Sequence, residues 1–144
     1  MSGEPIAIAS DHAGVDLKAV LAEDLRTLGF EVLDLGTDGH ESVDYPDFAD
    51  RMAVAIAAGQ ATRGVLVCGS GLGISIAANR HPGIRAAPCH DVTTARLARA
   101  HNDANVLALG ARVVGIEVAL ECLRTFLDTG FEGGRHQRRV DKMG

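Results

Sequence analysis

A cysteine stands at the entrance of a glycine-rich turn in the stretch GVLVCGSGLGISIAAN (64–79). An apolar run ends at Cys68, and glycines follow at alternate positions, Gly69, Gly71 and Gly73. Glycines let backbone N–H groups approach a ligand closely, and a helix that begins there directs the positive end of its dipole at the same point. That setting favours the thiolate form of a neighbouring cysteine. The stretch therefore predicts a reactive thiol beside a site for a developing negative charge.

Two familiar phosphate-binding motifs do not fit this turn. The dinucleotide fingerprint G-x-G-x-x-G needs a glycine where Ile74 stands, and it belongs after a first strand rather than a third. A P-loop needs Gly-Lys-Ser/Thr, and no lysine lies near. The residues leave three functions open: a Cys–His hydrolase, an enzyme that uses Cys68 as a general base while the amides hold an enediolate oxygen, and a module that binds nucleotide or phosphate without turnover.

The elements that must position the thiol alternate along the chain. Short apolar runs, typical of buried parallel strands, alternate with segments of helical periodicity. Because a helix follows each strand, we expect the α/β class, as a three-layer αβα sandwich with a Rossmann-like, open, five-stranded parallel sheet. The pattern does not give the order of the strands. The expected strands are 5–10, 30–36, 64–69, 83–89 and 105–110, and the expected helices are 11–29, 44–59, 72–80, 91–103 and 115–130.

Polar residues gather at the carboxyl ends of the expected strands, where open α/β sheets bind their ligands. Asp11 and His12 follow the first strand, and Arg112 follows the fifth. Asp11 also suits the N-cap of the first helix, which is the commoner role of an aspartate there. In the tail, Arg135 and Arg139 are four residues apart, so a helix would place them on one face as a phosphate anchor. A solvated terminal charge run is the alternative.

Length and composition restrict the class of protein. The 144 residues, 47% of them hydrophobic, suffice for one domain (1–144) with a real core. The net charge of −5 argues against nucleic-acid binding, and no apolar run approaches the roughly 20 residues of a membrane span. The stretch MSGEPIAIAS lacks the features of a signal peptide, and three separated cysteines suggest neither a disulfide framework nor a metal site. We expect a cytoplasmic enzyme.

Four separated stretches together resemble the family of type B ribose-5-phosphate isomerases, which includes the galactose-6-phosphate isomerase subunits. They are the Asp11-His12 pair, CGSGLGISIAAN (68–79), ARAHNDANVLALGAR (98–112) and EGGRHQRRV (132–140). The resemblance implies interconversion of ribose 5-phosphate and ribulose 5-phosphate, a step of the pentose phosphate pathway, without metal or organic cofactor. Galactose 6-phosphate or allose 6-phosphate is the alternative substrate.

The resemblance also implies a role for each matching residue. Cys68 would be the base that moves a proton between C2 and C1, and His101 would assist opening of the furanose ring. The Ser70 hydroxyl and the amides of the turn would stabilise the enediolate. The implied substrate contacts are Asp11 and His12 (sugar hydroxyls or phosphate), Tyr45, Gly69, Gly71, Leu72, Gly73 and Asn102 (the pocket around the sugar), and Arg112, Arg135 and Arg139 (the phosphate, with the basic tail 132–144).

The resemblance finally implies how the chain assembles. Members of the family form dimers whose active site takes residues from both subunits, so we expect a homodimer or a larger homo-oligomer with shared sites. Some members lack the thiol and use a glutamate elsewhere. The cysteine at the motif position here favours the thiol-base mechanism.

Overall fold

The centre of the molecule is one sheet of five strands, all parallel, in the order β2-β1-β3-β5-β4. The structure is a computed structural model that describes residues 3–144. The strands are short, and the central strands β1, β3 and β5 are almost entirely apolar, as expected where helices cover both faces of a parallel sheet, whereas the edge strand β2 carries the exposed Glu31 and Asp34. The strands are β1 (Pro5–Ser10), β2 (Glu31–Asp34), β3 (Arg63–Cys68), β4 (Ala86–Pro88) and β5 (Val106–Gly110).

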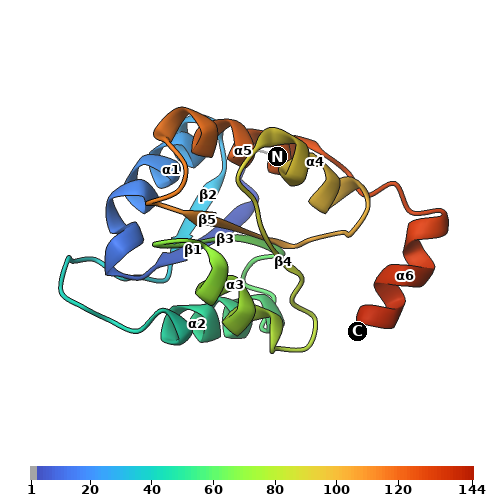
Figure 1. Cartoon of the computed structure of the whole chain (residues 1–144), viewed down its shortest axis with the longest axis horizontal. Coiled ribbons are helices and arrows are strands. Elements are labelled where there is room, and N and C mark those ends of the chain that lie inside the picture. Colours follow the sequence, from blue (N-terminus) through green and yellow to red (C-terminus); the bar gives the residue numbers. More distant parts are fainter. Residues whose placement is uncertain (1–2) are drawn as a thin grey trace.

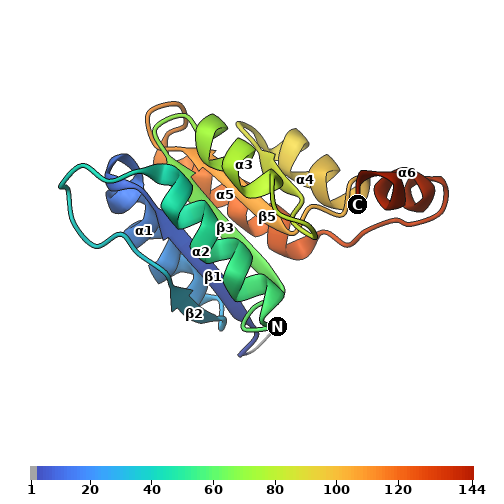
Figure 2. The same cartoon turned by 90° about the horizontal axis from the view of Figure 1, so that it is seen from below.

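Two layers of helices enclose this sheet (Figure 1). One layer holds α1, α4 and α5, and the other holds α2 and α3, which lie in front in Figure 2. The predicted three-layer αβα sandwich is therefore confirmed. The helices are η1, a 3-10 turn (His12–Gly14), α1 (Val15–Thr27), α2 (Tyr45–Ala57), α3 (Leu72–Asn79), α4 (Val92–Ala100), α5 (Ile116–Asp128) and α6 (Arg135–Met143).

The side chains of each strand alternate between the two faces of the sheet, and this divides the core into two clusters. Ile6 and Ile8 of β1 pack against the α1, α4 and α5 layer, where Phe126 of α5 is fully buried. Ala7 of β1 faces the other way, toward α2 and α3, where Ile74 is fully buried. Successive side chains of a strand point to opposite faces, so the continuous apolar runs supply both cores at once.

The structure corrects several expected boundaries. β2 ends at Asp34 and β4 covers Ala86–Pro88, so both strands are shorter than expected. The first helix begins with the separate turn η1. Asp44 does occupy the N-cap position of α2, but its side chain makes no capping hydrogen bond.

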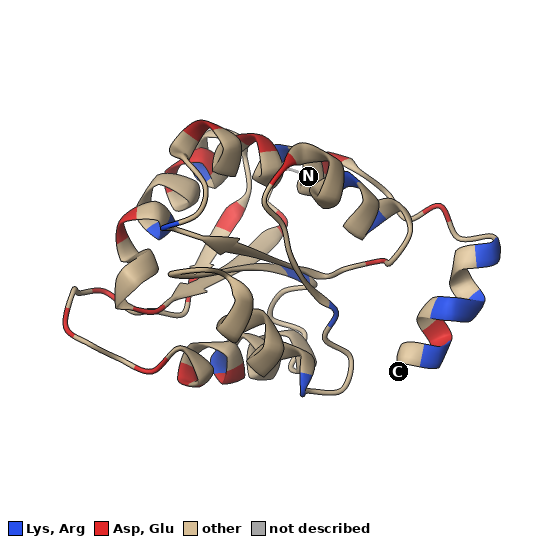
Figure 3. Ribbon diagram, viewed as in Figure 1, with Lys and Arg blue, Asp and Glu red and all other residues tan. Residues whose placement is uncertain are grey.

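The tail forms a basic helix that stands apart from the sandwich. α6 lies beyond α4 in both views (Figures 1 and 2), and much of its ribbon is blue in Figure 3, where blue marks Lys and Arg. Val140 is the residue of this helix that is buried. Across the described residues, no helix combines the length and the apolar character that crossing a bilayer requires.

The strand order creates a crevice between β1 and β3. These two strands are neighbours in the sheet, yet the chain leaves β1 toward α1 on one face and leaves β3 toward α3 on the other. Such a switch point at the carboxyl ends of the strands is where open α/β sheets bind ligands. Asp11 follows β1 and the glycine-rich turn follows β3, so both border this crevice.

Candidate active site

A cavity of about 420 Å³ opens at the carboxyl ends of β1, β3 and β5. It joins residues that are as much as 102 positions apart in the sequence, from Asp11 to Val113, and it includes the predicted base. The lining residues are Asp11, Tyr45, Cys68, Gly69, Ser70, Gly73, Arg112 and Val113. All of these except Val113 were predicted as site residues.

The thiol of Cys68 is held by the turn that follows it. The side chain is 4% exposed, and its Sγ accepts a hydrogen bond of 3.2 Å from the Gly71 N–H. Gly71 is the N-cap of α3 and has φ +80°, a conformation that side-chain-bearing residues rarely adopt. A Cβ at Gly71 would lie 3.0 Å from the Leu109 carbonyl carbon. Glycine is therefore required there, and its backbone places an N–H donor against the Cys68 sulfur.

The other amides of the turn divide into two groups. The Leu72 N–H donates to the Ser70 Oγ at 3.2 Å, so the amides of Leu72 and Gly71 already have acceptors. The N–H groups of Gly69, Ser70 and Gly73 have no acceptor in the part of the chain that the structure describes. These three amides remain able to stabilise an oxyanion in the cavity.

Arg112 brings a fixed positive charge to the same turn. Its backbone N–H donates to the Gly69 carbonyl at 2.9 Å, which ties the end of β5 to the end of β3. A Cβ built on Gly69 would lie 3.4 Å from the Arg112 Nη1, so the guanidinium lies directly over that glycine. Its forked donors suit a phosphate or another anion in the cavity.

Asp11 and His12 are oriented by backbone groups. The Asp11 Oδ1 accepts from the Ala13 N–H at 3.0 Å and the Gly14 N–H at 3.2 Å, so it caps η1 as well as lining the cavity. The Val43 N–H donates to the His12 Nδ1 at 3.1 Å. A neutral imidazole that accepts at Nδ1 carries its proton on Nε2, so His12 presents a donor at that atom.

Tyr45 forms the opposite side of the cavity. It is the first residue of α2 and is 40% exposed. Its ring lies so close to α3 that a Cβ on Gly73 would be 2.5 Å from the tyrosine Cζ. Gly73 therefore has two effects, because it leaves its amide accessible and makes room for the aromatic ring.

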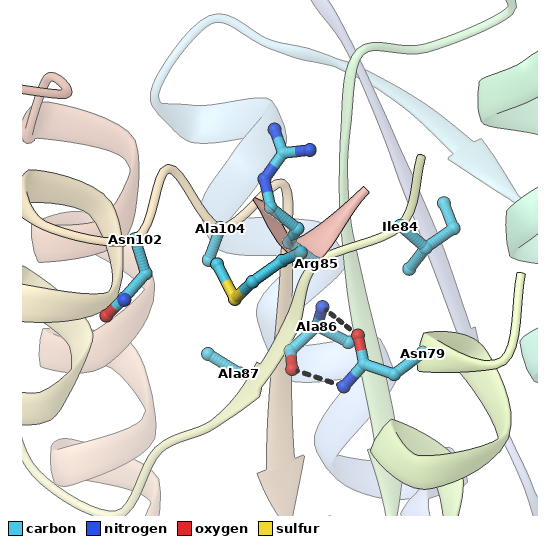
Figure 4. Close-up of a pocket in the computed structure, with 8 residues that line it drawn as sticks. Asn79, Ile84, Arg85, Ala86, Ala87, Asn102 and Ala104 are labelled. Carbon is cyan, nitrogen blue, oxygen red and sulfur yellow. Dashed lines mark hydrogen bonds between the residues drawn. The ribbon is translucent and has the colours of Figure 1, made fainter. Parts of the chain in front are cut away.

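His101 and Asn102 lie away from this cavity within the same chain. His101 is the C-cap of α4, which runs back along β5 to the amino edge of the sheet. The five residues of β5 separate that edge from the thiol, a span of about 16 Å. Asn102 lines a second cavity of about 350 Å³, drawn in Figure 4.

The second cavity lies beside the edge strand β4. Figure 4 shows Asn102 at one side and Asn79 at the other, with two hydrogen bonds that join the Asn79 side chain to the backbone of Ala86. These bonds, of 2.8 and 2.7 Å, fix the end of α3 to β4. Met143 of α6 also lines this cavity.

The predicted phosphate anchors of the tail lie on α6, at the far end of the molecule from the thiol (Figures 1 and 2). Arg135 and Arg139 are both exposed, one helical turn apart, as the sequence spacing predicts. Within one chain, the structure therefore brings Arg112 to the thiol but leaves Arg135 and Arg139 apart from it.

Two polar residues that the sequence analysis passed over contact His101. The rings of His101 and His136 are stacked, with centroids 4.2 Å apart, and the Glu132 carboxylate lies within 4 Å of both rings. Glu132 and His136 are four residues apart in the EGGRH stretch. Residues with this spacing lie close together when the chain is helical, so the sequence could have indicated that these two side chains are neighbours. No sequence pattern gave their contact with α4.

The two remaining cysteines contrast with Cys68. Cys89 and Cys122 are almost fully and fully buried, and both pack in the hydrophobic core on the α1, α4 and α5 side of the sheet. Burial raises the pKa of each thiol to about 11. Both are therefore protonated near neutral pH.

Comparison with known proteins agrees with this geometry. Residues 6–143 match the Ribose/Galactose Isomerase family. Ribose-5-phosphate isomerase B of Escherichia coli K12 is 48% identical over 138 residues, which are 96% of this chain and 93% of that protein.

Solved structures give the same result. Ribose-5-phosphate isomerase B of Clostridium thermocellum is 55% identical with a TM-score of 0.96, over 97% of this chain and 95% of that chain. The enzyme of Mycoplasma genitalium with bound ribulose-5-phosphate is 43% identical with a TM-score of 0.94, over 99% of this chain and 95% of that chain. The match extends over almost the whole chain, and the thiol, the glycine turn and the arginine meet in one cavity. The chain therefore belongs to the ribose/galactose isomerase family.

Proposed function

We propose that this protein is an aldose–ketose isomerase that interconverts ribose 5-phosphate and ribulose 5-phosphate with Cys68 as the general base. The observation that carries the proposal is one cavity that contains a thiol, amides without acceptors and an arginine. Membership of the isomerase family supports this function over a Cys–His hydrolase and over a binding module without turnover. The reaction belongs to the pentose phosphate pathway, and we propose a cytoplasmic location with it.

The proposed reaction begins with ring opening. The C1–O4 bond of the furanose breaks, O4 receives a proton and the C1 hydroxyl gives one up, which leaves an open-chain aldehyde. His101 is the proposed proton donor to O4, and Asn102 is a proposed substrate contact beside it. Asp11, His12 and Tyr45 would hold the sugar hydroxyls in the cavity. Their fixed orientations favour one reactive pose, because positioning lowers the entropic part of the barrier.

The proton transfer follows. The Cys68 thiolate takes the proton from C2, the C1=C2 double bond forms, and the negative charge moves to O1. The unpaired amides of Ser70 and Gly73, assisted by Gly69 and the Ser70 hydroxyl, would stabilise this enediolate. Return of the proton to C1, with proton transfer from the C2 hydroxyl to O1, gives the ketose. The net reaction moves a hydrogen from C2 to C1 of the same sugar, without an external oxidant or reductant. The proposed mechanism therefore uses no cofactor and no metal ion.

The complete site requires a second copy of the chain. Cys68 and His101 lie at opposite edges of the same sheet, so one molecule does not bring both to one sugar. We propose a homodimer in which His101, Asn102, Arg135 and Arg139 of one subunit approach the Cys68 cavity of the other. Arg112 with the two tail arginines would then bind the phosphate, remote from the reacting carbons, and its binding energy would hold them in place.

The five-carbon sugar is the proposed substrate because the relatives described above are ribose-5-phosphate isomerases. A coupled assay of the purified protein against ribose 5-phosphate, allose 6-phosphate and galactose 6-phosphate tests this choice. We expect the highest kcat/KM with ribose 5-phosphate. A higher value with either six-carbon sugar would contradict it.

Replacement of the thiol tests the mechanism. Cys68→Ala is expected to lower kcat for ribose 5-phosphate by about 10³-fold, within the range that general-base catalysis supplies, while sugar-phosphate binding is retained. Cys122→Ala is the matched control, because that buried thiol lies in the core against the other face of the sheet, and its kcat should stay unchanged. Isomerisation at the wild-type rate by Cys68→Ala would refute the assignment of the base.

A further inference from the structure

His101 is held in a cluster with two residues of the tail segment. The His101 and His136 rings stack with centroids 4.2 Å apart and planes inclined by 14°. The Glu132 Oε1 lies 3.8 Å from the His101 Nε2 and 3.7 Å from the His136 Nε2. One carboxylate therefore faces both imidazoles.

The backbone fixes this cluster from both sides. The Glu132 N–H donates to the Ala100 carbonyl at 3.0 Å, which joins the tail segment to the last residue of α4. The His136 N–H donates to the Gly133 carbonyl, and Gly133 and Gly134 both have positive φ values that turn the chain into α6. The His136 side chain is only 11% exposed, whereas that of His101 is 37% exposed. His136 is thus the covered ring that supports a more accessible one.

The electrostatic surroundings keep His136 neutral near pH 7. Burial lowers its pKa below the ordinary 6.5, and the neighbouring His101, Arg135 and Arg139 lower it further, against the opposing effect of Glu132. A neutral His136 places no positive charge against the His101 ring, and the Glu132 Oε1 lies 3.8 Å from the His101 Nε2.

The ring geometry does not suit a metal ion. A zinc-type site needs the in-plane lone pairs of its histidines to converge on one point about 2 Å from each nitrogen. The lone pairs of two stacked rings inclined by only 14° lie in two nearly parallel, separate planes, so they do not converge on one point close to both rings. The cluster is arranged to orient a ring rather than to chelate an ion.

We propose that His136, together with Glu132, is a positioning residue that holds the His101 imidazole for proton transfer to the sugar. This proposal rests on the function of His101 proposed above. His136 acts through His101 and does not itself touch the reacting atoms. Its effect should appear in kcat, because a proton donor that is free to rotate spends less time aligned with O4.

Single variants separate this role from a phosphate contact. His136→Ala is expected to lower kcat for ribose 5-phosphate about tenfold with KM within about twofold of wild type, because positioning affects the reaction more than binding. His136→Phe can still stack and should keep kcat within about threefold of wild type. The control is Arg26→Ala, an exposed arginine on α1 outside both cavities and outside the tail, which should leave both parameters unchanged.

A double-mutant cycle tests the route of the effect. In a His101→Ala background, His136→Ala should lower kcat no further, since the ring that it positions is gone. Activity stays measurable in that background because open-chain aldehyde exists in solution. Thermal melts of every variant check that the fold persists.

Three results would overturn the proposal. They are an unchanged kcat in His136→Ala, a rise in KM alone, and an equal loss of kcat with and without His101. Failure of the proposed function looks different, because the wild-type protein itself would then not isomerise ribose 5-phosphate.

Discussion

At the scale of the residue, the thiol and its turn form one unit. The Gly71 N–H donates to the Cys68 Sγ, and Gly71 has a φ of +80°, which glycine adopts without the strain that a side chain would bring. Ser70 likewise accepts from the Leu72 N–H, which leaves other amides of the turn available to the cavity. The amides of the turn thus divide between those that bond to the Cys68 thiol or the Ser70 hydroxyl and those that can face a ligand in the cavity.

A methyl group at Gly71 should damage this unit. Gly71→Ala introduces a strained φ and a contact of 3.0 Å with the Leu109 backbone, so the amide must move away from Cys68. We expect a loss of about 1 kcal/mol or more in the free energy of unfolding, from the left-handed conformation alone, and a lower kcat. Denaturant unfolding and a steady-state assay measure the two effects.

Gly59→Ala is the control for that change. Gly59 also has a positive φ, of +76°, but no atom lies within 4 Å of the built Cβ, and it is at the end of α2. The Gly59→Ala variant should lose a similar amount of the free energy of unfolding as Gly71→Ala, and its kcat should stay at the wild-type value. If both variants kept wild-type kcat, the Gly71 amide would have no catalytic importance.

The three cysteines should differ in reactivity. Burial raises the pKa of Cys89 and Cys122 to about 11, so at pH 8 only about one thousandth of each is thiolate, and neither thiol is exposed. Cys68 lines the cavity. Iodoacetamide at pH 8 should therefore label one thiol per folded chain, at Cys68, as mass spectrometry of peptides would show. Labelling of Cys89 or Cys122 at the same rate contradicts this expectation.

At the scale of the element, Arg63 joins three pieces of the sandwich. It begins β3, donates two hydrogen bonds to Glu4 just before β1, and donates a third to the Leu127 carbonyl near the end of α5. Hydrogen bonding to Arg63 lowers the pKa of Glu4 below its ordinary 4.5. This ion pair holds the amino edge of the sheet, opposite the candidate site.

The pair should make stability depend on pH. A depressed pKa means that Glu4 contributes stability above its unfolded value of 4.5, which is lost as pH falls through the lower folded value. We expect Glu4→Gln to cost about 1 kcal/mol of the free energy of unfolding at pH 7 and less as the pH falls below 4.5, for example at pH 3. Urea unfolding at both pH values gives the difference.

An exposed pair on α1 supplies the comparison. Glu23 lies 3.9 Å from Arg26, and both side chains are more than half exposed, so Glu23→Gln should change stability little at either pH. An equal cost in the two variants would show that the Glu4 pair has no special structural role.

At the scale of the whole molecule, the functional residues divide between two ends of the chain's fold. The carboxyl edge of the sheet carries Cys68, Asp11 and Arg112, and the opposite end carries His101 with the basic helix α6. The homodimer with shared sites that we propose would unite the two sets. A cyclic pair of identical chains would then form two equivalent sites.

Mixed dimers test this arrangement directly. Co-expressed Cys68→Ala and His101→Ala chains should regain activity, because a hybrid dimer has one site with both residues intact and one with neither. With random pairing, half of the dimers are hybrids, so about one quarter of wild-type kcat is expected. Each variant expressed alone is the control. Absence of recovery, with hybrid dimers confirmed by mass, would show that both residues act within one chain.

The sequence by itself determined the class of fold and much of the site. Alternating apolar runs and helical periods predict a layered parallel sheet, because these patterns reflect local burial and local hydrogen bonding. The glycines around Cys68 and the residues after β1 and β5 predict the cavity, since the carboxyl ends of parallel strands share one edge. The polar residues Asp11, Ser70 and Arg112 were found in this way, and the structure places them together.

Only the tertiary structure decided which strands are neighbours, which amides are free and which predicted residues meet. The order β2-β1-β3-β5-β4, the contact of Tyr45 with Gly73 and the stacking of His136 on His101 all join segments far apart in sequence. Sequence periodicity carries no information on such pairings, because they depend on the packing of whole elements against one another. For the same reason, the separation of His101 and α6 from the thiol became visible only once the chain was folded.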